Sequence, residues 1–182
     1  MDKYLLSLIN SNQRVFHTQD LSLLWQMSGN TLYTTIKRYC AKGTMNRVFK
    51  GMYIIGKLED IDPFLLGIKV LNRYAYISTE TILANNGIIN QKILYITLIS
   101  SVSRKFKIGN HSYVCRQLND QYLFQAADIK EKDGVKYAGT SRAVADLLYF
   151  NPKYYFDNSK LINWSEVNKI KKEIGYANPK TK

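Results

Sequence analysis

Residues 27–55, MSGNTLYTTIKRYCAKGTMNRVFKGMYII, decide how the first part of the chain folds. Apolar residues recur at helical spacing as far as Cys40, and Gly43 stands where a glycine often ends a helix. Two short apolar runs follow, MNRVF and MYII, and Lys50-Gly51 joins them as in a β-hairpin. The segment therefore predicts a helix followed by a hairpin.

Two further helical patterns precede this segment. DKYLLSLIN at 2–10 places its apolar side chains on one face, and a second helix follows from Thr18, a candidate N-cap, to a core position at Trp25. Three short helices and a hairpin within 57 residues are typical of a winged helix-turn-helix. We therefore expect a winged helix-turn-helix DNA-binding domain at 1–57.

The rest of the chain mixes both kinds of element. Acids reappear at 58–64, where Pro63 suits a first helical turn, and we place a linker there. The sequence predicts an α+β protein, in which the winged helix-turn-helix precedes a mixed α/β domain at 65–182 with antiparallel hairpins. In that domain we expect helices at 62–72, 79–87 (capped by Ser78), 141–150 and 164–175, a hairpin at 103–118, strands at 95–100, 122–129 and 135–139, and a frayed tail at 177–182.

The charge composition of the chain indicates the kind of partner it binds rather than its fold. The 182 residues carry 26 Lys and Arg against 14 Asp and Glu, a formal net charge of +12, while 46% hydrophobic residues exclude wholesale disorder. Such an excess favours a polyanion such as nucleic acid, or an acidic protein. No acid occurs between Asp20 and Glu59, whereas six bases do. A segment that lies along phosphates gains from excluding carboxylates, which would repel the backbone.

The predicted third helix has two different faces. Leu32, Ile36 and Tyr39 define its core face, with Cys40 at the inner edge. In a winged helix the opposite face enters the major groove, where Arg and Asn contact base edges and Lys, Thr and Tyr mostly hold phosphates. The DNA-facing candidates, two of them from the hairpin, are Asn30, Thr31, Tyr33, Thr34, Lys37, Arg38, Arg47 and Lys50. A solvated helix face, or a winged helix that contacts only a protein partner, would show the same pattern.

Little in the chain indicates catalysis. Residues 60–62 read D-I-D, but the glycine–serine turn that nucleotidyl transfer needs upstream is missing. Asp120 and Asp128 resemble the acids of a nuclease D…D-x-K signature, at a short spacing of eight. Neither histidine has metal-ligand spacing, and no glycine loop for phosphate is present. We expect no enzyme, no cofactor and no metal, with a nuclease centred on Asp128 as a remaining alternative.

Two cysteines, Cys40 and Cys115, are too few for a disulfide framework, which favours a reducing cytoplasm. The apolar run near the start is too short for a signal peptide. No run approaches 18 apolar residues, so we expect no membrane segment.

Four blocks of the chain resemble the AbiEi family of type IV antitoxins. The first is the segment at 27–55, and the others are AYISTETILANNGII at 75–89, ITLISSVSRKFKIGNHSYVCRQL at 96–118 and GVKYAGTSRAVADLLYF at 134–150. They cover most of 27–150 in the order of the family.

The resemblance implies an abortive-infection (phage-defence) antitoxin that binds operator DNA through its N-terminal domain and represses its own operon, as a monomer or a DNA-induced dimer. The C-terminal domain would counteract a nucleotidyltransferase toxin, with direct contact left open. By position, the same eight residues would face DNA, and Asp146 belongs to a helix motif that we interpret as structural. The family often has a proline-containing cap before that helix, whereas Thr140-Ser141-Arg142 stands here.

Overall fold

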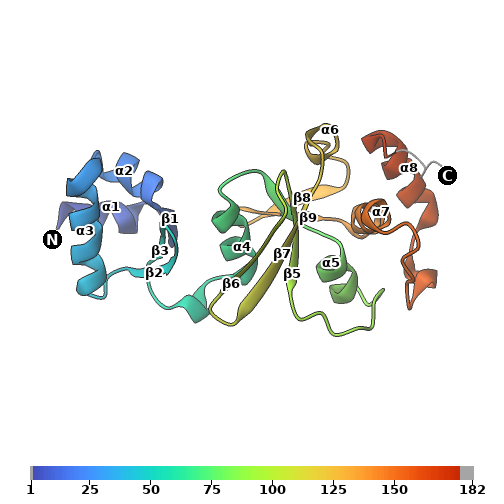
Figure 1. Ribbon diagram of the computed structural model, residues 1–182, viewed down its shortest axis with the longest axis horizontal. Coiled ribbons are helices and arrows are strands. Elements are labelled where there is room, and N and C mark those ends of the chain that lie inside the picture. Colours follow the sequence, from blue (N-terminus) through green and yellow to red (C-terminus); the bar gives the residue numbers. More distant parts are fainter. Residues whose placement is uncertain (1, 177–182) are drawn as a thin grey trace. The chain divides into compact units, whose positions relative to one another are not determined.

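The computed structural model describes residues 2–176, and the chain divides into two compact units, Met1–Val70 (unit 1) and Leu71–Lys182 (unit 2) (Figure 1). Both units combine helices with strands, which confirms the predicted α+β class. The boundary between the units follows Val70 and so lies after the linker predicted at 58–64. The tail predicted at 177–182 lies outside the described residues.

Unit 1 combines short helices with a small antiparallel sheet. Its helices are α1 (Lys3–Asn10), α2 (Thr18–Trp25), α3 (Gly29–Ala41) and α4 (Pro63–Leu71), which runs to the boundary; its strands are β1 (Val15–His17), β2 (Asn46–Phe49) and β3 (Met52–Ile54), and a 3-10 turn spans Leu58–Asp60. Strand β3 lies between β1 and β2 and is antiparallel to both. The predicted hairpin is therefore confirmed, and β1, which the sequence did not indicate, completes the sheet.

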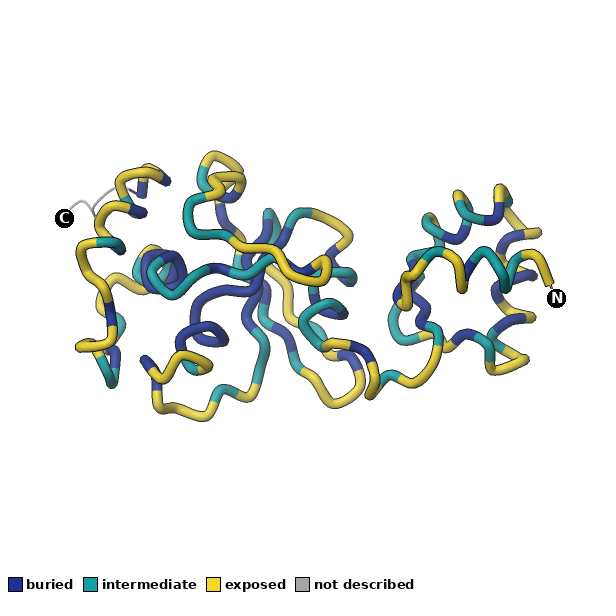
Figure 2. Tube along the Cα trace, turned by 180° about the vertical axis from the view of Figure 1, so that it is seen from behind, coloured by how far each residue is buried: buried dark blue, intermediate teal, exposed yellow. Residues whose placement is uncertain are grey.

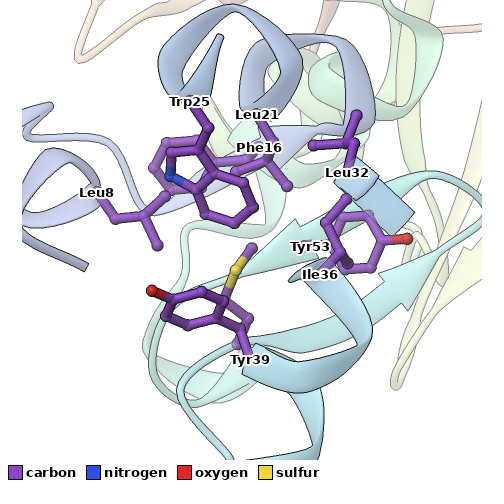
Figure 3. Packing of buried hydrophobic residues seen from close by; sticks show 9 residues of the cluster. Leu8, Phe16, Leu21, Trp25, Leu32, Ile36, Tyr39 and Tyr53 are labelled. Carbon is purple, nitrogen blue, oxygen red and sulfur yellow. The ribbon is translucent and has the colours of Figure 1, made fainter. Parts of the chain in front are cut away.

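The core of unit 1 collects the apolar faces of its helices (Figure 3). Leu32, Ile36 and Tyr39 are each 3% exposed, as predicted for the inner face of α3. The Trp25 ring lies 5.4 Å from that of Tyr39, and its indole N–H donates to the Tyr4 carbonyl at 3.3 Å. The predicted core position of Trp25 is thus confirmed. The other buried members are Leu8, Phe16, Leu21, Met45 and Tyr53.

Helix α2 begins one residue earlier than predicted. Its N-cap is His17 rather than Thr18, and the Asp20 carboxylate accepts a hydrogen bond from the His17 backbone N–H at 2.7 Å. The His17 ring is hydrogen-bonded to the Lys69 carbonyl. Because Asp20 reaches back to the residue before Thr18, the helix is capped at that residue.

Unit 2 contains a six-stranded mixed sheet in the order β6-β7-β5-β4-β9-β8. Its strands are β4 (Ala75–Ile77), β5 (Ile96–Ser100), β6 (Arg104–Ile108), β7 (His111–Gln117), β8 (Ile129–Lys132) and β9 (Val135–Ala138); its helices are α5 (Glu80–Asn85), α6 (Asp120–Leu123), α7 (Thr140–Phe150) and α8 (Trp164–Ile174), with a 3-10 turn at Ser159–Leu161. The hairpins β6–β7 and β8–β9 are antiparallel, and parallel pairs join each to the centre. Buried residues run through the central strands and α7, whereas the hairpin tips are exposed (Figure 2).

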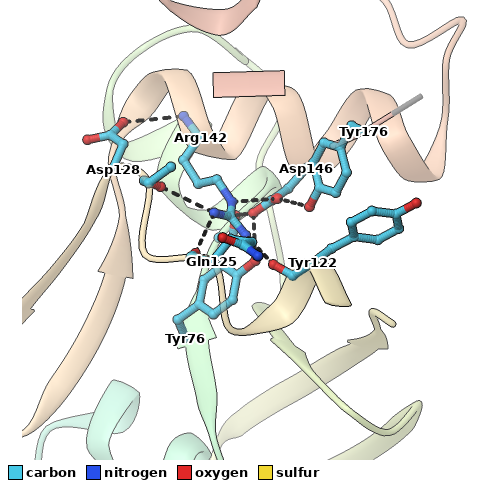
Figure 4. Close-up of polar contacts among 9 residues, drawn as sticks. Tyr76, Tyr122, Gln125, Asp128, Arg142, Asp146 and Tyr176 are labelled. Carbon is cyan, nitrogen blue, oxygen red and sulfur yellow. Dashed lines mark hydrogen bonds and ion pairs between the residues drawn. The ribbon is translucent and has the colours of Figure 1, made fainter. Parts of the chain in front are cut away.

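A buried ion pair ties α7 to the rest of unit 2 (Figure 4). The Arg142 Nε donates to Asp146 Oδ1 at 2.9 Å, and both side chains are 0% exposed. Asp146 also accepts hydrogen bonds from the hydroxyl groups of Tyr76, Ser78 and Tyr176. A buried pair is tolerated only when its remaining polar atoms are satisfied, and here they are. The structural role expected for Asp146 is confirmed.

The same arginine explains why the strand predicted at 122–129 is wrong. Its Nη1 donates hydrogen bonds to the backbone carbonyls of Gln125 at 2.9 Å and Ala127 at 3.2 Å. Asn119 caps helix α6, which takes up the first residues of the segment. Carbonyl groups engaged by a guanidinium do not pair with a neighbouring strand, so β8 begins only at Ile129.

The cap predicted for α5 is also displaced by this network. Thr79, with a φ of 51°, is the N-cap residue, and the Ser78 hydroxyl donates to Asp146 at 2.8 Å instead. A hydrogen bond to a buried carboxylate is stronger than one to a backbone amide, so the serine is drawn inward.

Asp146→Ala leaves Arg142 buried without its counter-charge. We expect the free energy of unfolding of unit 2 to fall by about 3–5 kcal/mol, measured by urea unfolding of the full chain. Lys169→Ala, which removes an exposed ion pair with Glu166 at 3.6 Å, is the control and should change it by less than about 1 kcal/mol. Equal effects of the two variants would contradict the assignment.

Alkaline pH should destabilise the same unit. Burial, followed by the charge of Asp146, raises the pKa of Tyr76 and of Tyr176 above the ordinary 10.0, and burial raises the pKa of Cys115 to about 12. Unfolding returns these groups to ordinary values, so the unfolded chain loses protons first and the stability present below about pH 9 is lost as the pH rises. We expect the unfolding transition that Asp146→Ala shifts to move to lower urea between pH 8 and pH 10.5, and to move less in Tyr176→Phe. A midpoint independent of pH would refute this.

Candidate nucleic-acid interface

All eight residues predicted to face DNA are exposed in unit 1. Six lie on α3, Arg47 lies on β2, and Lys50 lies in the turn between β2 and β3. Because the apolar side of α3 is buried in the core, its polar side is directed away from the unit. Tyr33 is 59% exposed, the largest apolar surface on this side of the helix. Whether the eight residues touch DNA stays a prediction.

The end of α3 sets the geometry of the candidate surface. Gly43 has a φ of 69°, which a glycine adopts without strain. Its N–H donates to the Cys40 carbonyl and the Thr44 N–H donates to the Tyr39 carbonyl, each at 3.0 Å. Cys40 is half-buried against the core, as expected for the inner edge. The helix therefore stops abruptly, as its glycine predicted, and the chain turns into β2.

The hairpin carries the other two candidates on an irregular ladder. Arg47 pairs with Tyr53, and the register then shifts before Phe49 pairs with Met52. The Arg47 Nε donates to the Phe49 carbonyl at 3.4 Å across this irregularity. A shift of register bends the strand and redirects its side chains, here just before the turn that holds Lys50.

One carboxylate reaches the candidate surface from outside the acid-free window. Asp2 caps α1 through the Tyr4 N–H at 3.1 Å, and its carboxylate is close enough to the C-terminal end of α3 to interact with the charges of Arg38 and Lys42. The Tyr39 hydroxyl beside it lowers the pKa of Asp2, and the Tyr4 N–H and the charges of Arg38 and Lys42 act in the same direction. The carboxylate is therefore held ionised next to the cations. Only the packing of α1 could reveal this neighbour, because Asp2 is far from α3 in the sequence.

Asp128, the residue on which the nuclease alternative depends, caps a helix. Its carboxylate accepts a hydrogen bond from the Arg142 backbone N–H at 3.3 Å, at the start of α7. A Cβ added to Gly139 would lie 2.1 Å from the carboxylate oxygens, so any larger residue there would displace the Asp128 side chain from this position. Asp128 therefore has a structural role at the start of α7.

The two aspartates of the D-I-D motif at 60–62 also have structural partners. The Asp62 carboxylate accepts a hydrogen bond from the Phe64 N–H at 2.9 Å at the start of α4, and Asp60 forms an exposed ion pair with Arg14 at 3.8 Å. Across residues 2–176, no three His, Cys, Asp or Glu side chains gather closely enough to hold a metal ion.

Unit 2 holds a pocket of about 460 Å³ that no spacing in the sequence indicates. Its charged wall is an ion pair between Glu80 of α5 and Arg116 of β7, with the guanidinium 5.5 Å from the Phe150 ring. Glu80 Oε2 and Arg116 Nη1 are buried without a hydrogen-bond partner in the described part of the chain. The pair is neutral as a whole, and it brings together residues 36 positions apart.

The chain matches no family model and no curated protein sequence. The resemblance to the AbiEi family therefore rests on the four sequence blocks alone. Among the helices of residues 2–176, none combines the length and the apolar character that a membrane crossing needs.

The two faces of α3 should respond differently to truncation. Ile36→Ala removes a buried side chain and should lower the free energy of unfolding of unit 1 by about 2–5 kcal/mol. Lys37→Ala, one position further along, should change it by less than about 0.5 kcal/mol, because the side chain is exposed. Urea unfolding of both variants measures the difference. A comparable loss in Lys37→Ala would show that this side of α3 is packed and is no free surface.

Proposed function

We propose that unit 1 is a winged helix-turn-helix that binds double-stranded operator DNA, with α3 as the recognition helix and the β2–β3 hairpin as the wing. The observation that carries the proposal is the division of α3 into a buried apolar face and an exposed face with Asn30, Lys37 and Arg38. A recognition helix needs both faces, because one must hold it to the domain while the other enters the major groove.

The chemistry of the exposed residues supports separate roles. Lys37, Arg47 and Lys50 neutralise phosphates and release counterions, which contributes affinity without sequence preference. Asn30 and Arg38 can each form two hydrogen bonds to one base edge, and a good paired contact discriminates by about 1–3 kcal/mol. The remaining candidates on α3 hold the helix against the backbone through hydroxyl groups.

We further propose that the chain is a type IV antitoxin that represses its own operon in the bacterial cytoplasm, and that unit 2 counteracts a nucleotidyltransferase toxin. The order of the four AbiEi-like blocks supports this reading. Both cysteines are free thiols, which suits a reducing compartment. A nucleotidyltransferase gene directly beside this one would support the antitoxin proposal independently of any DNA measurement.

A winged helix that contacts a protein partner is the second candidate function. It is favoured by two exposed apolar side chains, Leu23 on α2 at 73% and Tyr33 on α3 at 59%. Aromatic and apolar side chains are the usual anchors of protein interfaces. A salt titration separates the two functions, since DNA affinity falls steeply with salt whereas an apolar contact does not.

Substitutions on the exposed face should separate base reading from phosphate binding. Arg38→Ala is expected to weaken operator binding and to reduce the preference for operator over scrambled duplex, because it removes a paired base contact. Lys50→Ala should weaken binding to both duplexes alike. Gel-shift titrations of the full chain on the two duplexes measure both effects.

Asp2→Asn is the matched control of opposite sign. Asparagine keeps the cap of α1 but removes the negative charge beside Arg38, so affinity should rise on both duplexes. If neither Arg38→Ala nor Lys50→Ala changes affinity, the interface is assigned to the wrong surface.

A further inference from the structure

Two parallel strands of the unit 2 sheet, β5 and β7, end at the same level. Ser100, the last residue of β5, pairs with Gln117, the last residue of β7, and the Leu118 N–H donates to the Ser100 carbonyl at 2.9 Å (Figure 1). The segments that follow the two strands therefore leave the sheet at one edge. In open α/β sheets, ligands bind in the crevice outside the carboxyl ends of parallel strands. This edge is thus where the fold favours a ligand site.

Two pockets lie at this edge, and both are lined by Gln117. The larger (the Arg116 pocket) is the one of about 460 Å³ described above, and the smaller (the Asp120 pocket) has a volume of about 250 Å³. The larger one alone lies within the roughly 300–1,000 Å³ that is usual for small-molecule sites. Uncharged residues with hydrogen-bonding side chains line both pockets, namely Ser101, Ser103, Asn119 and Asn151.

The fold does not use the Glu80–Arg116 ion pair fully. Arginine and carboxylate groups frequently form two parallel hydrogen bonds, whereas here Arg116 Nη2 donates to Glu80 Oε1 alone. Glu80 Oε2 and Arg116 Nη1 stay buried without a partner among residues 2–176, and such groups cost free energy. The Glu80 side chain is 7% exposed but that of Arg116 is 24% exposed, so the guanidinium can turn toward a ligand in the pocket.

The backbone that presents Glu80 is strained. Thr79 has a φ of 51° and a ψ of −129°, which a β-branched residue rarely adopts. The flanking strand holds it there, since the Thr81 N–H donates to Thr97 Oγ1 at 3.0 Å and the Thr97 N–H donates to Thr81 Oγ1 at 2.7 Å. Strain of this kind clusters at ligand sites, where it fixes a side chain in position. The strain therefore supports a binding role for Glu80.

The Arg116 pocket suits an uncharged, planar ligand. Glu80 and Arg116 neutralise each other, so an anion gains no net attraction there. Phe150 and Tyr154 supply aromatic surface, and the planar guanidinium lies 5.5 Å from the Phe150 ring. Nucleobases stack on aromatic rings and on guanidinium planes, and their edges form hydrogen bonds with neighbouring polar groups. A nucleobase therefore matches this pocket.

The Asp120 pocket suits the sugar that a nucleoside carries beside its base. Asp120 is exposed and takes part in none of the ion pairs found within residues 2–176. Carboxylates accept hydrogen bonds from ribose 2′-hydroxyl groups in dinucleotide sites, whereas they repel phosphates. We propose that the two pockets together bind a ribonucleoside, with its base beside Arg116 and its ribose 2′-hydroxyl at Asp120. This site is separate from the DNA interface proposed for α3.

The test titrates the full chain with adenosine, guanosine, cytidine and uridine by isothermal titration calorimetry. At least one of them should bind with a dissociation constant of about 0.1 mM, the affinity usual for a ligand of this size. Its 2′-deoxy form should bind about tenfold more weakly, because a hydrogen bond to a charged group is lost.

Three variants assign the two halves of the site. Asp120→Asn should reduce the ribonucleoside affinity about fivefold and leave the deoxynucleoside affinity unchanged, because a charge-assisted hydrogen bond becomes a neutral one. Asp133→Asn, the same change in the exposed turn between β8 and β9, is the matched control and should alter neither affinity. Arg116→Lys keeps the positive charge beside Glu80 but removes the planar group, so it should weaken both forms alike, by about tenfold.

Failure of all four nucleosides to bind would overturn the proposal. So would equal losses in Asp120→Asn and Asp133→Asn, or an unchanged affinity in Arg116→Lys. Ribose alone serves as the remaining probe. If it binds as tightly as the best nucleoside, the pockets hold a sugar and the assignment of a base to the Arg116 pocket is wrong.

Discussion

Unit 2 depends on one buried ion pair. Arg142 and Asp146 lie on the same helix, yet their hydrogen bonds reach β4 through Tyr76 and the segment before β8 through the carbonyls of Gln125 and Ala127. Charges removed from water must be satisfied by the surrounding groups, so each partner constrains the segment that supplies it. The position of α7 on the sheet, the irregular segment before β8 and the cap of α5 all follow from that requirement.

Unit 1 uses the opposite arrangement, with an apolar interior and its charges outside. Helix α3 serves both the fold and the proposed interface, because a period of 3.6 residues separates Leu32, Ile36 and Tyr39 from Lys37 and the other exposed side chains. Exposed charges contribute little to folding, so they can be placed for a ligand. Asp2 is the exception, since it serves as a cap and also lowers the positive potential at one end of α3.

The elements that were predicted correctly are marked in the sequence by residues within the element or directly next to it. Gly43 marks the end of α3, and Lys50-Gly51 marks the turn of a hairpin, because both positions need a backbone that glycine adopts readily. The exposure of the six candidate residues on α3 followed from its helical periodicity. The strand predicted at 122–129 was wrong because its apolar pattern resembled a strand, whereas its carbonyl groups were already engaged by a distant arginine.

The sequence by itself determined the α+β class, the two hairpins, the inner and outer faces of α3 and the excess of cations, since all of these depend on local spacing and composition. Tertiary structure alone decided the sheet order with its parallel pairs, the neighbours of Arg142, the meeting of Glu80 with Arg116 and the approach of Asp2 to α3. Most of these contacts join residues far apart in the chain, and the i,i+4 pair of Arg142 and Asp146 acquires its importance only from the burial around it. Packing and desolvation set such contacts, and no periodicity in the sequence encodes them.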